Sequence, residues 1–231
     1  MSTPTSRSVR ARLIVDRDHY VTLIKAIEDA KVSVWISTAN VKSMMIEAPV
    51  GTVARARGKY VSILDTFDGL ARRGVDLRLL HAGLPSGPFR NELRKHPGLV
   101  TQKKTVPRDK SSRGLAIRQC PRVHLKVIAI DGRLLYLGSA NFTGAGLGAK
   151  GDGRRNFELG ILTDDDVMLD TAQERFEAIW SGKECKGCKV RRFCPAPLDQ
   201  QTIAGKRMQK LRVLGTSEAS LPEQSKVPTS L

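Results

Sequence analysis

The sequence predicts an α/β fold in which a mixed, largely parallel sheet is flanked by helices and followed by a small cysteine-containing C-terminal extension. Its 231 residues are 40% hydrophobic and 27% charged, which is enough for one sizeable core with short tails. Helix and strand patterns alternate in the first half of the chain, as in proteins that join parallel strands through helices. Three of the four cysteines follow the last predicted helix, so the composition changes there.

The first half of the chain supplies the alternating elements. Apolar residues at helical spacing predict a helix over 16–31, and the alternating VSVWIST at 32–38 predicts a strand. A proline and two glycines mark 42–58 as a loop. A second amphipathic helix is predicted over 60–73, and the apolar VDLRLLH predicts the next strand at 75–81.

The second half contains the most regular strand pattern. A short strand is expected at 99–105. RVHLKVIAI at 122–130 and RLLYLG at 133–138 are joined by an Asp-Gly turn, which is a strong hairpin signal. NFELGILT at 156–163 predicts a further buried strand. A helix over 164–180 carries acidic residues at its N-terminal end, where the helix dipole favours them.

Composition divides the chain into four segments. Residues 1–12 form a polar, basic arm that we expect to be disordered, and 13–181 contain the folded domain. The cysteine-rich segment covers 182–200, and a basic and then disordered tail covers 201–231. The sequence contains no internal repeat, so each motif of the domain occurs once.

The charge of the chain points to a polyanionic partner. Lys and Arg number 39 against 23 acidic residues, a formal net charge of +16, which suits nucleic acid or an anionic membrane surface. Aromatic residues make up 5%, so contacts to phosphate are favoured over base stacking. The sequence has neither a membrane-spanning apolar run nor a secretory signal at its start. We therefore expect a cytoplasmic protein without integral membrane association.

The predicted hairpin carries the one constellation of residues that indicates a chemistry. Its residues spell H-x-K-x4-D-x6-G-S-x-N, from His124, Lys126, Asp131, Gly138, Ser139 and Asn141. This pattern resembles the HKD motif of the phospholipase D superfamily, in its single-motif, nuclease-like branch. Asn156 and Glu158 in NFELG match a further family pattern on the following strand, and the resemblance extends from about Leu13 to Trp180.

The residues themselves suit a phosphodiester. Side chains alternate along a strand, so His124 and Lys126 are expected on one face, an imidazole beside an ammonium. Ser139 and Asn141 again share a face and offer hydroxyl and amide donors to phosphate oxygens. A phosphodiester carries one negative charge, so these groups suit it without a divalent metal.

The resemblance implies a phospholipase D-like fold and a reaction in two displacements. His124 would attack phosphorus to form a phosphohistidine, which water then hydrolyses. In the family the leaving oxygen takes its proton from a histidine in a second motif copy, and this sequence has one copy. We therefore expect a homodimer whose active site lies on the twofold axis.

Two carboxylates are further candidates through the same resemblance, which assigns such residues to orienting and tuning the histidine. Glu158 is the candidate for holding the His124 imidazole N–H. Asp131 lies in the Asp-Gly turn, where it is either a family site residue or a turn former whose carboxylate binds local backbone.

The cysteines form a candidate metal site. Cys185, Cys188 and Cys194 have the spacing C-x2-C-x5-C, and Cys120 provides a fourth ligand if the C-terminal segment folds back. The spacing resembles the iron–sulfur staple of RecB-type nucleases, and zinc accepts four thiolates equally well. Reduced cysteines without a metal are the third interpretation. Either metal would be structural, with none required for catalysis.

Basic residues flank the motif and are candidates for substrate binding, against the alternative of an ordinary solvated surface. The candidates are Lys103, Lys104, Arg118, Arg122, Arg154 and Arg155.

Three functions are compatible with these features. The favoured one is a metal-independent endonuclease that cleaves DNA or RNA. A phospholipase D-type hydrolase of phospholipid head groups or cardiolipin is the alternative, since anionic bilayers attract basic proteins. An inactive nucleic-acid-binding module ranks third, because the motif is intact.

Overall fold

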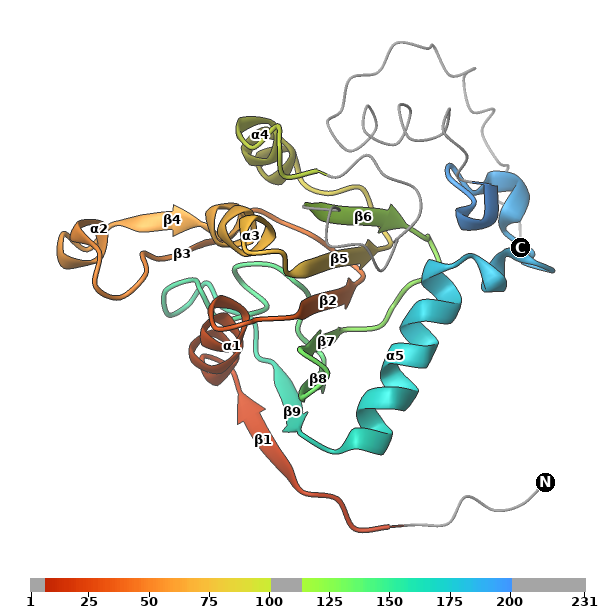
Figure 1. Cartoon of the computed structure of the whole chain (residues 1–231), viewed down its shortest axis with the longest axis horizontal. Coiled ribbons are helices and arrows are strands. Elements are labelled where there is room, and N and C mark those ends of the chain that lie inside the picture. Colours follow the sequence, from red (N-terminus) through yellow and green to blue (C-terminus); the bar gives the residue numbers. More distant parts are fainter. Residues whose placement is uncertain (1–6, 101–113, 201–231) are drawn as a thin grey trace, which may run out of the picture.

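The computed structural model of the chain describes residues 7–100 and 114–200, which form a seven-stranded sheet with helices on both faces (Figure 1). In spatial order the strands are β1 (Ala11–Val15), β9 (Leu159–Thr163), β8 (Leu134–Gly138), β7 (Val127–Ile130), β2 (Ser33–Thr38), β5 (Asp76–His81) and β6 (Leu115–Gln119). The pairs β2–β5 and β5–β6 are parallel, and the other four are antiparallel. The predicted mixed α/β class is confirmed, with its parallel pairing confined to three strands.

Helices join the three parallel strands. α3 (Ile63–Arg72) lies between β2 and β5 in the chain, and α4 (Gly87–Lys95) lies between β5 and β6. α3 begins at Ile63 rather than at the predicted residue 60, because Ser62 caps it. The Ser62 hydroxyl accepts the Leu64 N–H at 3.2 Å, and the Asp65 carboxylate accepts the Ser62 N–H at 3.0 Å.

The predicted loop at 42–58 contains structure of its own. β3 (Met45–Glu47) pairs with β4 (Tyr60–Ser62) in a small antiparallel sheet, and α2 (Val53–Ala56) lies between them. Two glycines and a proline mark the turns of this excursion correctly, but three-residue strands are too short to give a readable alternation.

The predicted hairpin is formed by β7 and β8. Asp131 and Gly132 connect these strands with φ values of 55° and 61°, so both central residues of the turn are left-handed. Arg133 completes the three-residue connection, and its N–H donates to the Ile130 carbonyl at 2.9 Å across the turn. Left-handed central residues let a tight turn follow the twist of its strands. β9 then pairs with β8, so that Gly138 lies opposite Gly160.

The two faces of the sheet carry separate apolar cores. α1 (Lys25–Glu28), which continues a π-helical turn at Tyr20–Ile24, covers one face together with α3. α5 (Asp166–Trp180) covers the other face, as Figure 1 shows. Neighbouring residues of β2 face opposite ways: Ile36 packs in the first core, and Trp35 stacks on Phe176 of α5 with ring centroids 5.3 Å apart.

Both edge strands of the sheet differ from the sequence predictions. β1 begins at Ala11, so the end of the predicted disordered arm is part of the sheet. At the other edge, β6 begins at Leu115, in a stretch where no strand was predicted, and Val100 of the predicted strand at 99–105 bridges to Leu115. Residues 101–105 lie outside the described residues. Both edge strands contain arginine among their apolar residues, which obscured the strand pattern.

The C-terminal extension follows α5 as three short 3-10 turns, Lys183–Cys185, Arg191–Phe193 and Leu198–Gln200. Leu198 returns to the core beside Trp180, so the extension packs against the end of α5. Within 7–100 and 114–200, no helix has the length and apolar character that crossing a bilayer requires.

Candidate active site

His124 and Lys126 form an adjacent pair on an extended segment that leads into β7. The Lys126 Nζ lies 3.1 Å from His124 Nε2 and 3.2 Å from Nδ1, and it donates to the His124 carbonyl at 3.1 Å. β7 begins at Val127, so both residues precede the strand rather than lying within it. The Gly138 N–H still donates to the Lys126 carbonyl at 3.2 Å, which ties this segment to β8. The imidazole is exposed and the lysine is half-buried.

Glu158 binds two other site residues. Its carboxylate accepts hydrogen bonds from the Ser139 hydroxyl and, at 3.0 Å, from Asn156 Nδ2. The prediction that Glu158 holds the His124 imidazole is therefore not met in this chain. Register explains the pairing: Gly138 lies opposite Gly160, which brings Ser139 beside the chain at Leu159, whose N–H donates to the Ser139 hydroxyl at 3.1 Å.

The N-terminus of the domain fixes Glu158 in place. The Glu158 N–H donates to Asp16 Oδ1 at 3.0 Å, and the Asp16 N–H donates to the Glu158 carbonyl at 3.0 Å. Asp16 has a φ of 45°, which Asp tolerates better than most residues. The sequence places Asp16 at the start of the predicted helix over 16–31. Its position directly after a strand that pairs with β9 is the signal that was missed.

Asn141 is oriented by the end of β2. Its Oδ1 accepts hydrogen bonds from the Thr38 hydroxyl at 3.2 Å and from the N–H groups of Ala39 and Asn40 at 3.1 Å each. These donors identify the oxygen end of the amide, so the Nδ2 group is its donor end. Asn141 thus offers donors at the edge of the sheet where β2 and β8 end.

Asp131 lies at the opposite end of β7 from the His124–Lys126 pair. Its carboxylate accepts N–H groups from Lys31 at 2.9 Å, Val32 at 2.7 Å and Ser33 at 2.8 Å. Partial burial opposes its ionisation, but these donors outweigh that effect and lower the pKa of Asp131. These contacts match the turn-former interpretation of Asp131, in which its carboxylate anchors the start of β2, and a catalytic role stays a prediction.

A buried tyrosine supports the floor of the site. The Tyr136 ring fills the space beside Gly138 and Gly160, where a Cβ on either glycine would overlap it. Its hydroxyl accepts the Ala140 N–H at 3.3 Å, and burial raises the pKa of Tyr136 to about 12. His19 contacts the ring edge-on at 5.4 Å. Glycines at these two positions are required because the aromatic ring lies against the backbone.

The other three histidines each have a partner other than His124. His19 is fully buried, with Nδ1 2.9 Å from the Asp16 carbonyl. His81 is buried with Nδ1 2.8 Å from the Gly83 carbonyl, and burial lowers the pKa of His81 to about 4. His96 faces Asp65 at 3.3 Å.

The described substrate-binding candidates have different local surroundings. Arg118 is a structural residue, because its guanidinium stacks on Trp180 at 4.8 Å and donates to the Trp180 carbonyl. Arg122 lies beside the Cys188 thiol. Arg155 pairs with Asp152, and Arg154 is exposed nearby. The remaining two candidates, Lys103 and Lys104, lie outside the described residues.

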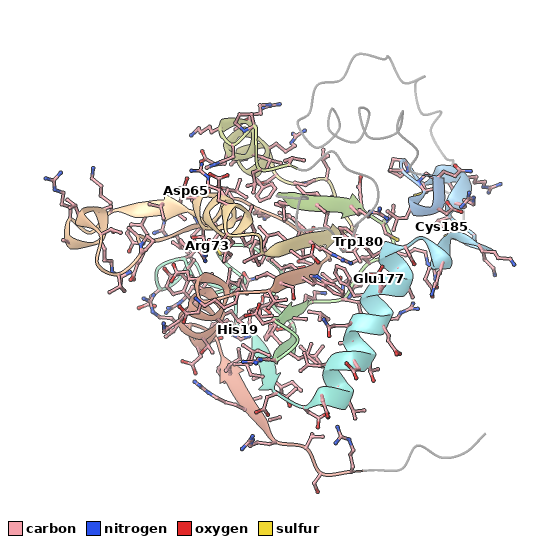
Figure 2. The ribbon with its side chains drawn as sticks, viewed as in Figure 1. His19, Asp65, Arg73, Glu177, Trp180 and Cys185 are labelled. Carbon is pink, nitrogen blue, oxygen red and sulfur yellow. The ribbon has the colours of Figure 1, made fainter. Side chains whose placement is uncertain are left out.

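The four cysteines lie around one cavity of the fold. Cys120, Cys185, Cys188 and Cys194 line one pocket between the end of β6 and the C-terminal extension. Figure 2 shows Cys185 in that extension, next to Trp180 at the end of α5. No three metal-ligating side chains among the described residues meet as the ligands of a single ion.

Comparison with known proteins gives a family and a set of similar folds. A family model described as "Cardiolipin synthase, PLD-like domain" matches residues 23–180. No curated protein matches the chain.

Among solved structures, NucT from Helicobacter pylori is 16% identical with a TM-score of 0.45, covering 74% of this chain and 94% of its own. The phospholipase D family member Nuc from Salmonella typhimurium is 16% identical with a TM-score of 0.44, covering 74% and 95%. Phosphatidylserine synthase from Haemophilus influenzae is 12% identical with a TM-score of 0.49, covering 94% and 46%.

Proposed function

The chain belongs to the phospholipase D-like family, and on that premise we propose that it is a metal-independent endonuclease that cleaves DNA or RNA through a phosphohistidine on His124. The observation that carries the proposal is the exposed His124 imidazole with the Lys126 ammonium 3.1 Å from its Nε2. A nucleophile and a cation at this spacing suit a singly charged phosphodiester.

The proposed reaction has two displacements. A ring nitrogen of His124 attacks phosphorus while the bond to the leaving oxygen breaks, and that oxygen takes a proton from an acid. Water then attacks phosphorus and returns a proton to the same acid as His124 leaves. Lys126 offsets the charge that grows on the phosphate oxygens. Ser139 and Asn141 border the same edge of the sheet as further donors.

The acid is proposed to come from a second copy of the chain. The motif occurs once, and His19, His81 and His96 are engaged elsewhere. A twofold arrangement would face the His124 residues of two subunits toward one phosphate, so that one attacks while the other donates the proton. The native mass of the active species, measured by light scattering, tests this: an active monomer would exclude it.

Charge favours a nucleic acid as substrate. The formal net charge of +16 suits a phosphate backbone. Hydrolysis of phospholipid head groups or cardiolipin is the alternative, because the same charge also suits an anionic bilayer.

The test compares substrates and histidines. Labelled single- and double-stranded DNA and RNA are incubated with the protein in EDTA, with phosphatidylcholine and cardiolipin vesicles in parallel. We expect nucleic-acid cleavage that survives EDTA, disappears in His124→Asn and persists in His96→Asn, a matched control outside the site. Lipid hydrolysis alone would replace the proposal with the phospholipase alternative. Nucleic-acid binding without turnover would identify an inactive binding module.

A further inference from the structure

The four cysteines lie in a pocket that is built from two distant parts of the chain. Cys120 follows β6, and its N–H donates to the His81 carbonyl at 2.8 Å, which fixes it to the end of the parallel strands. The other three cysteines belong to the extension. The cysteine pocket, meaning these four residues and the cavity between them, is closed by Val123 of the motif segment and Leu198 of the extension.

The backbone of the extension is wound so that the cysteines recur on one side. The Cys188 N–H donates to the Cys185 carbonyl at 3.3 Å, the Arg191 N–H to the Cys188 carbonyl at 3.0 Å, and the Cys194 N–H to the Arg191 carbonyl at 3.1 Å. The chain then returns against Gly182, whose φ is 84° and where a Cβ would overlap the backbone at Asp199. Glycine at position 182 therefore allows the extension to fold back beside the pocket.

The size of the pocket exceeds that of a single-ion site. Zinc bound to four thiolates has Zn–S bonds of about 2.3 Å, which requires the sulfurs to lie within about 4 Å of one another. The cysteines of the described residues do not converge in that way. They instead surround a cavity of about 70 Å³, several times the roughly 10–15 Å³ that one water-sized occupant needs.

From this geometry we propose that Cys120, Cys185, Cys188 and Cys194 bind an iron–sulfur cluster of the four-cysteine type. Four separated thiolates around a multi-atom cavity match a cluster, whose iron atoms each take one cysteine sulfur. Binding releases the thiol protons, and the cluster fills the cavity.

The charge of the surroundings supports an anionic group in this pocket. Arg122 and Arg191 both line it, and the Arg191 guanidinium contacts the Cys185 carbonyl at 3.4 Å. The Arg122 guanidinium lies beside the Cys188 thiol. A four-thiolate metal group carries net negative charge, so the adjacent guanidinium groups stabilise it.

The cluster would also fix the segment that carries the nucleophile. The Val123 N–H donates to the Cys120 carbonyl at 3.0 Å, and Val123 packs with Leu198 and Trp180. Three residues therefore separate a cluster ligand from His124 along a chain that is anchored at Cys120. Occupation of the pocket ties this segment to the extension without touching the reacting atoms.

The experiment measures the metal directly in the full chain. Protein purified without oxygen, or reconstituted with iron and sulfide, is assayed for iron, zinc, acid-labile sulfide, visible absorption and electron paramagnetic resonance after reduction. We expect about four iron and four sulfide per chain for a cubane cluster. We also expect its charge-transfer absorption to bleach on reduction, and both signals to be lost in Cys120→Ser and Cys188→Ser.

Phe193→Ala is the matched control, because Phe193 neighbours a ligand but is 72% exposed. It should retain iron and sulfide. One zinc per chain without sulfide, or no metal after reconstitution, would overturn the proposal. The wild-type content decides the question even if a cysteine variant does not fold. Because metal content is measured without a substrate, the result is independent of the proposed nuclease activity.

Discussion

The carboxylate of Asp131 accepts the backbone N–H of Val32 at 2.7 Å, across 99 positions of sequence. Together with the N–H groups of Lys31 and Ser33, this contact joins the β7–β8 turn to the first residues of β2. Asp131, the third residue of the HKD motif, therefore stabilises the sheet at the end of β7 that is remote from His124.

We predict that Asp131→Ala destabilises the protein without removing its chemistry. Loss of the carboxylate leaves three backbone N–H groups without their acceptor, which lowers the free energy of unfolding by about 1–3 kcal/mol. Urea unfolding measures this cost, with the exposed Asp170→Ala as control. Cleavage per folded molecule should persist; a loss as large as that in His124→Asn would restore Asp131 to the catalytic residues.

Lys126 is predicted to act on the transition state. Lys126→Met removes the ammonium beside His124, and the rate constant should fall by about 10²–10³-fold, as for other single donors to a developing charge. Lys126→Arg should recover part of that rate because it keeps the charge. Steady-state kinetics measure the effect. Lys95→Met, which removes an exposed lysine on α4, is the control for a general loss of basic charge. Equal rates in the two methionine variants would contradict the assignment.

Glu158 is predicted to be a positioning residue. Glu158→Gln weakens its hold on Ser139 and Asn156, so substrate contacts shift and kcat/KM should fall by up to about 10²-fold. Glu174→Gln, an exposed change of the same kind, is the control. Alanine at Ser139 provides the decisive comparison: if Glu158 acts through Ser139, the double variant should be little worse than either single variant. Fully additive losses would contradict the coupling.

The buried His81 gives a prediction on pH. Burial lowers its pKa to about 4 in the folded protein, against about 6.5 when unfolded, so the unfolded chain binds the proton more readily. Its contribution to stability is complete above pH 6.5 and is lost as the pH falls toward 4, by roughly 3 kcal/mol in total.

Urea unfolding of wild type and His81→Gln between pH 4 and 8 checks this. The variant should be less stable at pH 8 but should lose less stability on acidification. His96→Asn, which alters a histidine facing Asp65, should keep the wild-type acid dependence. Parallel pH curves for wild type and His81→Gln would show that another group controls acid unfolding.

Sequence alone gave the hairpin and the order of the motif because both are local. Alternating apolar residues and an Asp-Gly turn specify β7 and β8, and the motif letters lie within or next to these strands. The partners of the motif residues were not predictable in this way. Ser139 meets Glu158 through the β8–β9 register, and Asp131 meets Val32 through the position of β2 in the sheet. Strand order and register are properties of the whole sheet, which no local pattern contains.

The cysteines illustrate the intermediate case. Three of them are close in sequence, so their clustering was readable, and Cys120 could be proposed as the fourth from residue type alone. The packing partner of the Arg118 side chain, by contrast, could not be predicted from the sequence. Its charge suggested substrate binding, but packing on Trp180 removes it from that role.

The pairing of β1 with β9 makes the candidate site depend on a contact between the first and the last strand of the chain. Asp16 and Glu158 are separated by 142 positions, so their hydrogen bonds require nearly the whole domain to be synthesised and folded first. The β7–β8 hairpin can form earlier, because its contacts are local and their loop-closure entropy cost is small. A chain interrupted before β9 would thus display His124 and Lys126 on a formed hairpin while lacking Glu158 altogether. The contacts that hold Ser139 and Glu158 therefore form only after β9 has been synthesised, later than the hairpin that carries His124 and Lys126.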